Sequence, residues 1–141
     1  MARTPDELAL AALVGPFDVD LVASFGSRAA GSSRPGSDFD LGVLRRGGSR
    51  FDLGTLRALH VALSEWAGAE ADVVDLATGD AILRYEVVSA GRPLFEATPG
   101  VWVAFRAKAL VDHDDLAPFI DACIRGVGRV ARAGQDVGRK R

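Results

Sequence analysis

Two short apolar runs on either side of a glycine- and serine-rich stretch constrain the fold of this chain more than any other feature. The first run, Val19–Phe25, reads VDLVASF and ends at Gly26, and the second, Asp38–Leu44, reads DFDLGVL. Short apolar runs bounded by turn residues are typical of buried strands. The segment between them, 26–37, reads GSRAAGSSRPGS and taken alone is typical of a surface loop. The sequence therefore predicts two strands joined by a long loop.

The remainder of the chain alternates helical and strand patterns. Helices are predicted from Thr4 to Gly15, from Asp52 to about Trp66 and over 78–90, strands over 71–76 and 93–95, and further helices over about 99–132. Pro118 is expected to kink or divide these last helices, and the basic tail 134–141 is expected to fray. The order α-β-β-α-β-α-β followed by helices predicts an α/β or α+β domain with a helical C-terminal part. We expect one domain over 1–141 with its core at about 8–97.

The composition excludes several classes of protein. The 141 residues suit one ordinary domain, and 17 Lys and Arg against 19 Asp and Glu give a net charge of −2, which argues against a surface built for nucleic acid or membranes. A single cysteine, Cys123, excludes an internal disulfide and fits a reducing compartment, so we expect a cytoplasmic protein. The sequence has no run of 18 apolar residues and no visible signal peptide, so no membrane-spanning helix is expected.

Two aspartates at the start of the second predicted strand carry the clearest chemical signal. Asp38 and Asp40 are one residue apart, so on a strand both carboxylates point to the same side. Two adjacent like charges repel each other unless a cation lies between them, and carboxylate oxygens suit Mg²⁺, which also bridges to substrate phosphates. The Gly26-Ser27 turn after the first strand can present backbone N–H groups to such phosphates. This pattern predicts a site for Mg²⁺ and a phosphorylated substrate.

A third carboxylate on the next strand completes the pattern if the two strands are neighbours. Asp72 and Asp75 both lie on the predicted strand 71–76, and three positions apart they point to opposite faces. Only one of the two can therefore join the metal site. Asp72 is the first choice, Asp75 is its rival, and the simpler alternative for Asp72 is a carboxylate that faces solvent.

The arrangement of these residues resembles a known superfamily. Gly-Ser, a spacer of about ten residues, Asp-x-Asp and a later strand Asp are similar to the nucleotidyltransferases related to DNA polymerase β. The text GSRAAGSSRPGSDFDLGVL looks most like the minimal nucleotidyltransferases, the MNT proteins, and the resemblance extends over about residues 8–115. It implies a nucleotidyltransferase-like mixed sheet of about four strands flanked by helices.

The resemblance also implies a role for each residue of the pattern. Gly26 and Ser27 would bind the nucleotide phosphates, and Asp38 and Asp40 would each bind both of two Mg²⁺ ions. Asp72 would bind the catalytic ion and help to deprotonate the attacking hydroxyl. The reaction would be an in-line attack on the α-phosphate of a nucleoside triphosphate, ATP being the implied substrate, with pyrophosphate leaving.

One basic position departs from the pattern of many relatives. Arg28 would reach the β- or γ-phosphate of the nucleotide, but the second basic residue expected two positions later is replaced by Ala30. Arg34 on the same segment could supply the missing contact. A solvated Arg28 without a phosphate partner is the simpler alternative.

The size of the chain selects one branch of the superfamily. A polymerase needs further domains for template and primer, whereas a stand-alone domain of this length resembles the MNT antitoxins, which pair with a small all-helical HEPN ribonuclease toxin. The resemblance implies a protein adenylyltransferase that modifies a toxin tyrosine, in a hetero-oligomer with the toxin and without direct nucleic-acid or membrane binding. Two alternatives remain: an antitoxin that only masks its toxin, and an enzyme whose acceptor is a small hydroxylated metabolite.

Several other residues have structural explanations. Trp66, Trp102 and Phe105 fall at helical spacing and are expected in the core, as is Cys123 on an apolar helical stripe. His113 lies among acidic residues at a spacing that matches no metal site, and we expect a solvated helix end there.

Overall fold

The computed structural model describes the backbone of residues 5–26 and 39–139. It describes the side chains of residues 6–26, 39–119 and 121–126. Its strands are β1 (Val19–Phe25), β2 (Phe39–Arg45), β3 (Ala71–Asp75) and β4 (Arg92–Glu96). Its α-helices are α1 (Pro5–Val14), α3 (Leu53–Ala67), α4 (Ala81–Ala90) and α5 (Val101–Arg139), and short 3-10 turns follow α1 and β2 at Gly15–Phe17 and Arg46–Gly48.

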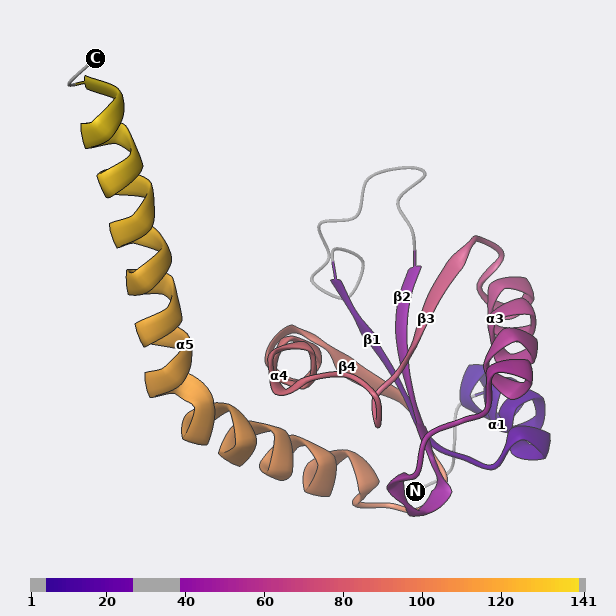
Figure 1. Cartoon of the computed structure of the whole chain (residues 1–141). Coiled ribbons are helices and arrows are strands. Elements are labelled where there is room, and N and C mark those ends of the chain that lie inside the picture. Colours follow the sequence, from indigo (N-terminus) through magenta and orange to yellow (C-terminus); the bar gives the residue numbers. More distant parts are fainter. Residues whose placement is uncertain (1–4, 27–38, 140–141) are drawn as a thin grey trace.

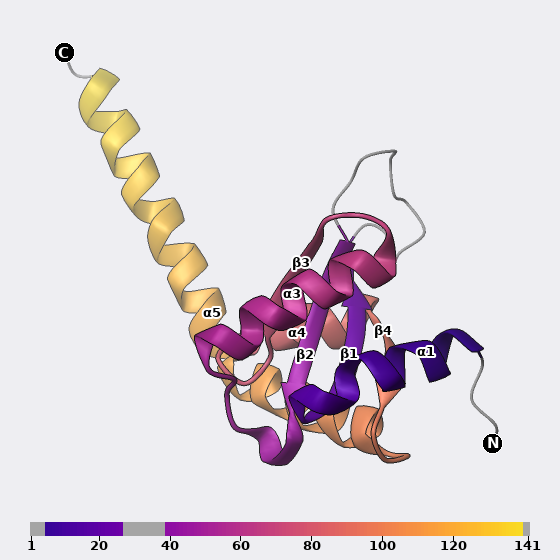
Figure 2. The same ribbon diagram turned by 90° about the vertical axis from the view of Figure 1, so that its right-hand side faces the viewer.

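The four strands form one mixed sheet in the order β3-β2-β1-β4. Strand β1 pairs antiparallel with β2 and with β4, and β2 pairs parallel with β3. Helices α1 and α3 cover one face of the sheet, and α4 with the first half of α5 covers the other (Figure 1). Figure 2 looks toward α1 and α3 in front of β1 and β2. The expected mixed sheet of four strands flanked by helices is confirmed.

Alternating side chains along the strands divide the core into two clusters. Leu41, Val43 and Ala71 pack under α1 and α3, whereas Leu21 and Ala23 pack under α4 and α5. Because successive side chains of a strand point to opposite faces, the sequence alternation determines which cluster each residue joins. The predicted core aromatics are confirmed: Trp66 packs against the first cluster, and Trp102 and Phe105 pack against the second.

The helix boundaries follow from local capping groups. Asp52 accepts a hydrogen bond from the Thr55 backbone N–H at 2.8 Å, and Gly68 ends α3 in a left-handed conformation. The next helix begins later than predicted, because its first turn is capped by the Asp80 carboxylate, which accepts from the Leu83 backbone N–H. Residues before Asp80 form a turn rather than a helix.

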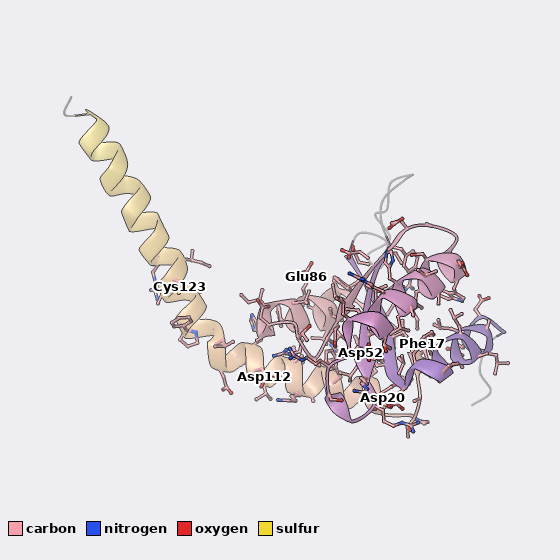
Figure 3. All side chains as sticks on the ribbon, turned by 45° about the vertical axis from the view of Figure 1, so that its right-hand side comes forward. Phe17, Asp20, Asp52, Glu86, Asp112 and Cys123 are labelled. Carbon is pink, nitrogen blue, oxygen red and sulfur yellow. The ribbon has the colours of Figure 1, made fainter. Side chains whose placement is uncertain are left out.

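Helix α5 confirms the kink expected at Pro118 and corrects two other expectations about the C-terminal part. It is one helix with Pro118 inside it, and its backbone stays helical to Arg139 instead of fraying from residue 134. The helix bends between Asp112 and Cys123 (Figure 3). We call the part before the bend the proximal half and the part after it the distal half, and the distal half leaves the domain. A proline inside a helix removes a hydrogen bond and clashes with the preceding turn, which accounts for the bend. Cys123, expected in the core, is exposed on this distal half.

His113 lies just before this bend and is not a solvated helix end. Its ring stacks on Tyr85 of α4 with centroids 3.7 Å apart, and its Nδ1 atom is buried. This contact fastens the proximal half of α5 to α4. None of the helices in the described part combines the length and the apolar character that a bilayer crossing requires.

Candidate functional site

The candidate site begins where β1 ends beside the start of β2. Phe25, the last residue of β1, is the register partner of Asp40, and Gly26 follows directly with a φ of +79°. A Cβ atom built on Gly26 would overlap Oδ2 of Asp40. A side chain is excluded at Gly26 both by its left-handed backbone and by this contact. The backbone at the end of β1 therefore lies directly against the Asp40 carboxylate.

The third carboxylate lies on the neighbouring strand at the same level. Asp40 and Asp72 are register partners in the parallel pair β2–β3. Their strand neighbours Leu41 and Ala71 are buried under α1 and α3, so by alternation both carboxylates face the other side of the sheet. Adjacent strands lie about 4.8 Å apart, so the two side chains stand next to each other on one face. The half-buried Asp40 lies on an inner strand, and the exposed Asp72 lies on an edge strand.

Asp75, the rival of Asp72, has a structural role instead. Its Oδ2 accepts a hydrogen bond from the Phe51 backbone N–H at 2.8 Å, and its Oδ1 accepts one from the Ala77 backbone N–H at 3.0 Å. The residue is 5% exposed and lies at the far end of β3 from Asp72. Its carboxylate joins the loop before α3 to the end of β3 and takes no part in the candidate site.

The structure thus brings together three of the predicted site residues. Gly26, Asp40 and Asp72 meet at one end of the sheet, whereas Ser27, Arg28, Asp38 and the alternative Arg34 lie outside the described residues. Two neighbouring carboxylates that face one side supply the hard oxygen ligands that Mg²⁺ prefers, so the described donors fit the expected ion. In the part of the chain that the structure covers, no group of three His, Cys, Asp or Glu side chains is close enough to form a complete metal site.

A pocket lies at the opposite end of the strands and is distinct from these carboxylates. It has a volume of about 570 Å³ and lies between α5, the start of β1 and the ends of β2 and β3. Its lining includes Leu44, Leu76 and Phe105 together with the charged residues Asp20 and Arg84. None of Gly26, Asp40 and Asp72 contributes to it. The sequence pattern gave no signal for this pocket, because its walls come from segments far apart in the chain.

The contact between Gly26 and Asp40 was also missed by the sequence analysis, which assigned Gly26 only to phosphate binding. The signal that could have found it is the glycine at a strand end, since such a residue permits close backbone approach. What could not be read from the sequence is that the approaching group is the Asp40 carboxylate, because this depends on the register between β1 and β2.

Solved structures share this fold over most of the chain. A chain from a crystal structure of a toxin–antitoxin with AMP-PNP superposes with a TM-score of 0.73 at 25% identity, over 86% of this chain and 97% of that one. A chain from the complex of tri-AMPylated Shewanella oneidensis HEPN toxin with MNT antitoxin has a TM-score of 0.68 at 23% identity, over 86% and 95%. A chain from the toxin–antitoxin MntA–HepT has a TM-score of 0.68 at 23% identity, over 86% and 96%.

Comparison of the sequence with known proteins and protein families bears more directly on which family the chain belongs to. No curated protein is significantly similar to it. A family model does match, however, and its span runs from α1 to the loop after β4 and so includes Gly26, Asp40 and Asp72. Because the model for "Polymerase beta, Nucleotidyltransferase" matches residues 11–99, which is well over half of the sequence, this chain belongs to that nucleotidyltransferase family.

Proposed function

We propose that this nucleotidyltransferase is a Mg²⁺-dependent protein adenylyltransferase, which transfers AMP from ATP to a tyrosine of a partner HEPN toxin and thereby neutralises it. The observation that carries the proposal is the adjacency of Asp40 and Asp72 beside the backbone of Gly26, in a chain that belongs to the polymerase beta nucleotidyltransferase family. The relative from a toxin–antitoxin with AMP-PNP, an ATP analogue, supports both the nucleotide and the kind of partner. The fold neighbour from a complex with a tri-AMPylated HEPN toxin supports the acceptor.

The carboxylates would hold the metal ions. Asp40 and Asp72, with Asp38, would bind two Mg²⁺ ions, whose chemistry is to neutralise the charge that develops on the attacking and leaving oxygens. Gly26, with Ser27, would donate backbone hydrogen bonds to the triphosphate, a role that a left-handed glycine without a side chain permits.

The transfer step exchanges one phosphorus–oxygen bond for another. The tyrosine hydroxyl oxygen forms a bond to the α-phosphorus of ATP, and the bond from that phosphorus to the β-phosphate oxygen breaks. Asp72, exposed at the edge of the sheet where an acceptor can approach, would accept the phenolic proton. Pyrophosphate leaves, and Arg28 would neutralise its charge. We expect the reaction in the cytoplasm, the compartment that suits a chain with one free cysteine.

Transfer of labelled AMP tests this proposal. The purified chain is incubated with α-³²P-ATP, Mg²⁺ and the protein encoded by the adjacent reading frame. We expect label on a tyrosine of the partner, and we expect Asp40→Asn to lower the initial rate at least about 100-fold. Glu86→Gln, which changes an exposed carboxylate on α4, should leave the rate unchanged. Label that fails to reach the partner, or that survives Asp40→Asn, contradicts the proposal.

A non-catalytic antitoxin is the second candidate, and one observation favours it. The distal half of α5 exposes large apolar side chains that could cover a toxin without chemistry. In cells that express the toxin, masking predicts that the Asp40→Asn, Asp72→Asn double variant still protects growth. Loss of protection by this variant, at unchanged protein level, leaves adenylylation as the means of neutralisation.

A further inference from the structure

One face of α5 is apolar in both halves of the helix, with Asp112 and His113 between the two apolar parts. In the proximal half, Trp102, Phe105 and Ala109 point into the domain. At 3.6 residues per turn, steps of three or four residues along the same face lead from Ala109 through Asp112 or His113, and then past the bend to Leu116, Phe119 and Cys123. The side of the helix that packs on the sheet is therefore apolar again after the helix has left the sheet.

The distal part of this face is uncovered. Phe119 is 67% exposed and Ile124, at the flank of the same face, is 64% exposed, while Leu116 and Cys123 are also open to solvent. We call these four residues the distal stripe. Figure 3 shows Cys123 on the part of α5 that projects beyond the sheet and its helices. Apolar side chains gathered on one face, rather than scattered singly, are typical of a protein interaction surface.

The charge of the surrounding segment bears on what covers the stripe. The segment 116–141 carries Arg125, Arg129, Arg132, Arg139, Lys140 and Arg141 against Asp121 and Asp136. A second copy of this chain would bring the same net positive segment alongside its own, and like charges side by side are unfavourable. A different protein with an acidic rim around an apolar groove has no such penalty. The toxin–antitoxin relative, similar over 86% of this chain, likewise comes from an assembly of two different proteins.

We propose that the distal stripe is the docking surface for the partner toxin, and that it enters an apolar groove with an acidic rim on that helical protein. This inference rests on the proposed function for the kind of partner, but not on the transfer of AMP. An amphipathic helix laid into a groove is a recurring mode of recognition, with anchors at spacings of three and four residues. Recognition through the distal stripe would leave the carboxylate end of the sheet free to act on the acceptor.

The single cysteine of the chain provides a direct test. The reaction rate of Cys123 with a fluorescent maleimide is measured for the full chain alone and with a saturating amount of the adjacent-frame toxin. We expect the toxin to slow labelling at least tenfold, because the sulfur lies on the distal stripe. An unchanged rate in a complex that demonstrably forms overturns the inference. If labelling of Cys123 slows as the concentration of this chain alone is raised, without toxin, the docking inference is overturned in favour of self-association.

Substitutions on opposite faces of α5 provide a matched comparison. Phe119→Asp should weaken toxin binding at least about 30-fold, the loss typical of an interface anchor. Val103→Asp is the control, because Val103 is equally exposed, at 69%, but lies on the opposite face of the helix. Equal affinities of the two variants would overturn the inference. AMP transfer to the toxin, measured in parallel, separates the two proposals. If AMP is transferred while Cys123 stays unprotected, only the docking surface is refuted. If Cys123 is protected but no AMP is transferred, only the adenylyltransferase proposal is refuted.

Discussion

Gly26 shows how one residue can place the end of a strand against a carboxylate. The residue has a positive φ, and its Cα faces the Asp40 carboxylate closely enough that no Cβ fits between them. The close approach fixes where the backbone of Gly26 lies relative to the Asp40 carboxylate. Glycine is required here for two reasons: the positive φ disfavours other residues, and a Cβ atom would overlap the Asp40 carboxylate.

Replacing this glycine should disturb the site more than the fold. Gly26→Ala would push the Asp40 carboxylate away, and misplacement by about 1 Å typically costs about 100-fold in rate. We expect a loss of this size in AMP transfer with little change in far-UV circular dichroism. Transfer kinetics and a crystal structure of the variant would measure the two effects, and an unaffected rate would show that the contact is dispensable.

The two aspartates of β3 should separate activity from stability. Asp72→Asn changes an exposed carboxylate, so the free energy of unfolding should move by less than about 0.5 kcal/mol while transfer is lost. Asp75→Ala removes the acceptor for the buried Phe51 N–H and should cost about 1–3 kcal/mol of stability. Urea unfolding of both variants, with transfer assays on the folded fraction, checks the pair. The opposite pattern would exchange their assigned roles.

These residues show what the sequence could predict. The faces of Asp72 and Asp75 follow from the two-residue period of a strand, which needs no structure. The pairing of Asp40 with Asp72 was conditional on β2 and β3 being neighbours, and the register supplies that condition. The hydrogen bonds of Asp75 could not be predicted, since Phe51 is 24 residues away and meets Asp75 only through tertiary packing.

At the scale of elements, local chemistry predicted helices well where a single cap dominates. Helix α3 begins after Asp52 and ends at Gly68 as the sequence indicated. Helix α4 begins later than predicted, because Thr78 and Asp80 are both acceptable caps and only Asp80 accepts from the backbone of the first turn. The kink expected at Pro118 is confirmed, whereas the continuation of α5 to Arg139 was not predicted, because a basic terminal segment is expected to fray.

The cap of α3 has a testable dependence on pH. The hydrogen bond from the Thr55 backbone N–H favours the charged carboxylate and holds the pKa of Asp52 below its ordinary value of 3.8. A lowered pKa contributes stability that is complete above 3.8 and is lost as the pH falls through the folded-state pKa. The stability difference between the wild type and Asp52→Ala should therefore be constant near pH 7 and shrink below pH 3.8.

Urea unfolding at pH 7 and in steps below pH 4 measures this difference. Asp52→Asn is the matched control, because asparagine caps a helix about as well as aspartate but does not ionise. A gap to Asp52→Ala that widens on acidification would contradict the assigned cause.

At the scale of the molecule, α5 has two halves with different dependence on the domain. The proximal half contributes Trp102 and Phe105 to the core, whereas the distal side chains Phe119 and Ile124 are largely exposed. Phe119→Asp should therefore leave the unfolding midpoint within about 2 °C of the wild type, whereas Phe105→Asp should lower it by well over 5 °C. Differential scanning fluorimetry distinguishes them, and equal shifts would mean that the distal half packs on the domain in solution.

The position of Asp72 on an edge strand has a consequence for colloidal behaviour. Strand β3 borders the sheet on one side and β4 borders it on the other, and an open strand edge invites pairing with a second molecule unless a charge or a proline blocks it. Strand β4 carries Arg92 and Pro93, and β3 carries the exposed Asp72. The Asp72 carboxylate, proposed to act in catalysis, would therefore also disfavour edge-to-edge pairing of β3 with a second molecule. Light scattering should therefore detect more association in Asp72→Asn than in Asp40→Asn, which neutralises an inner strand and is the cleaner inactive variant.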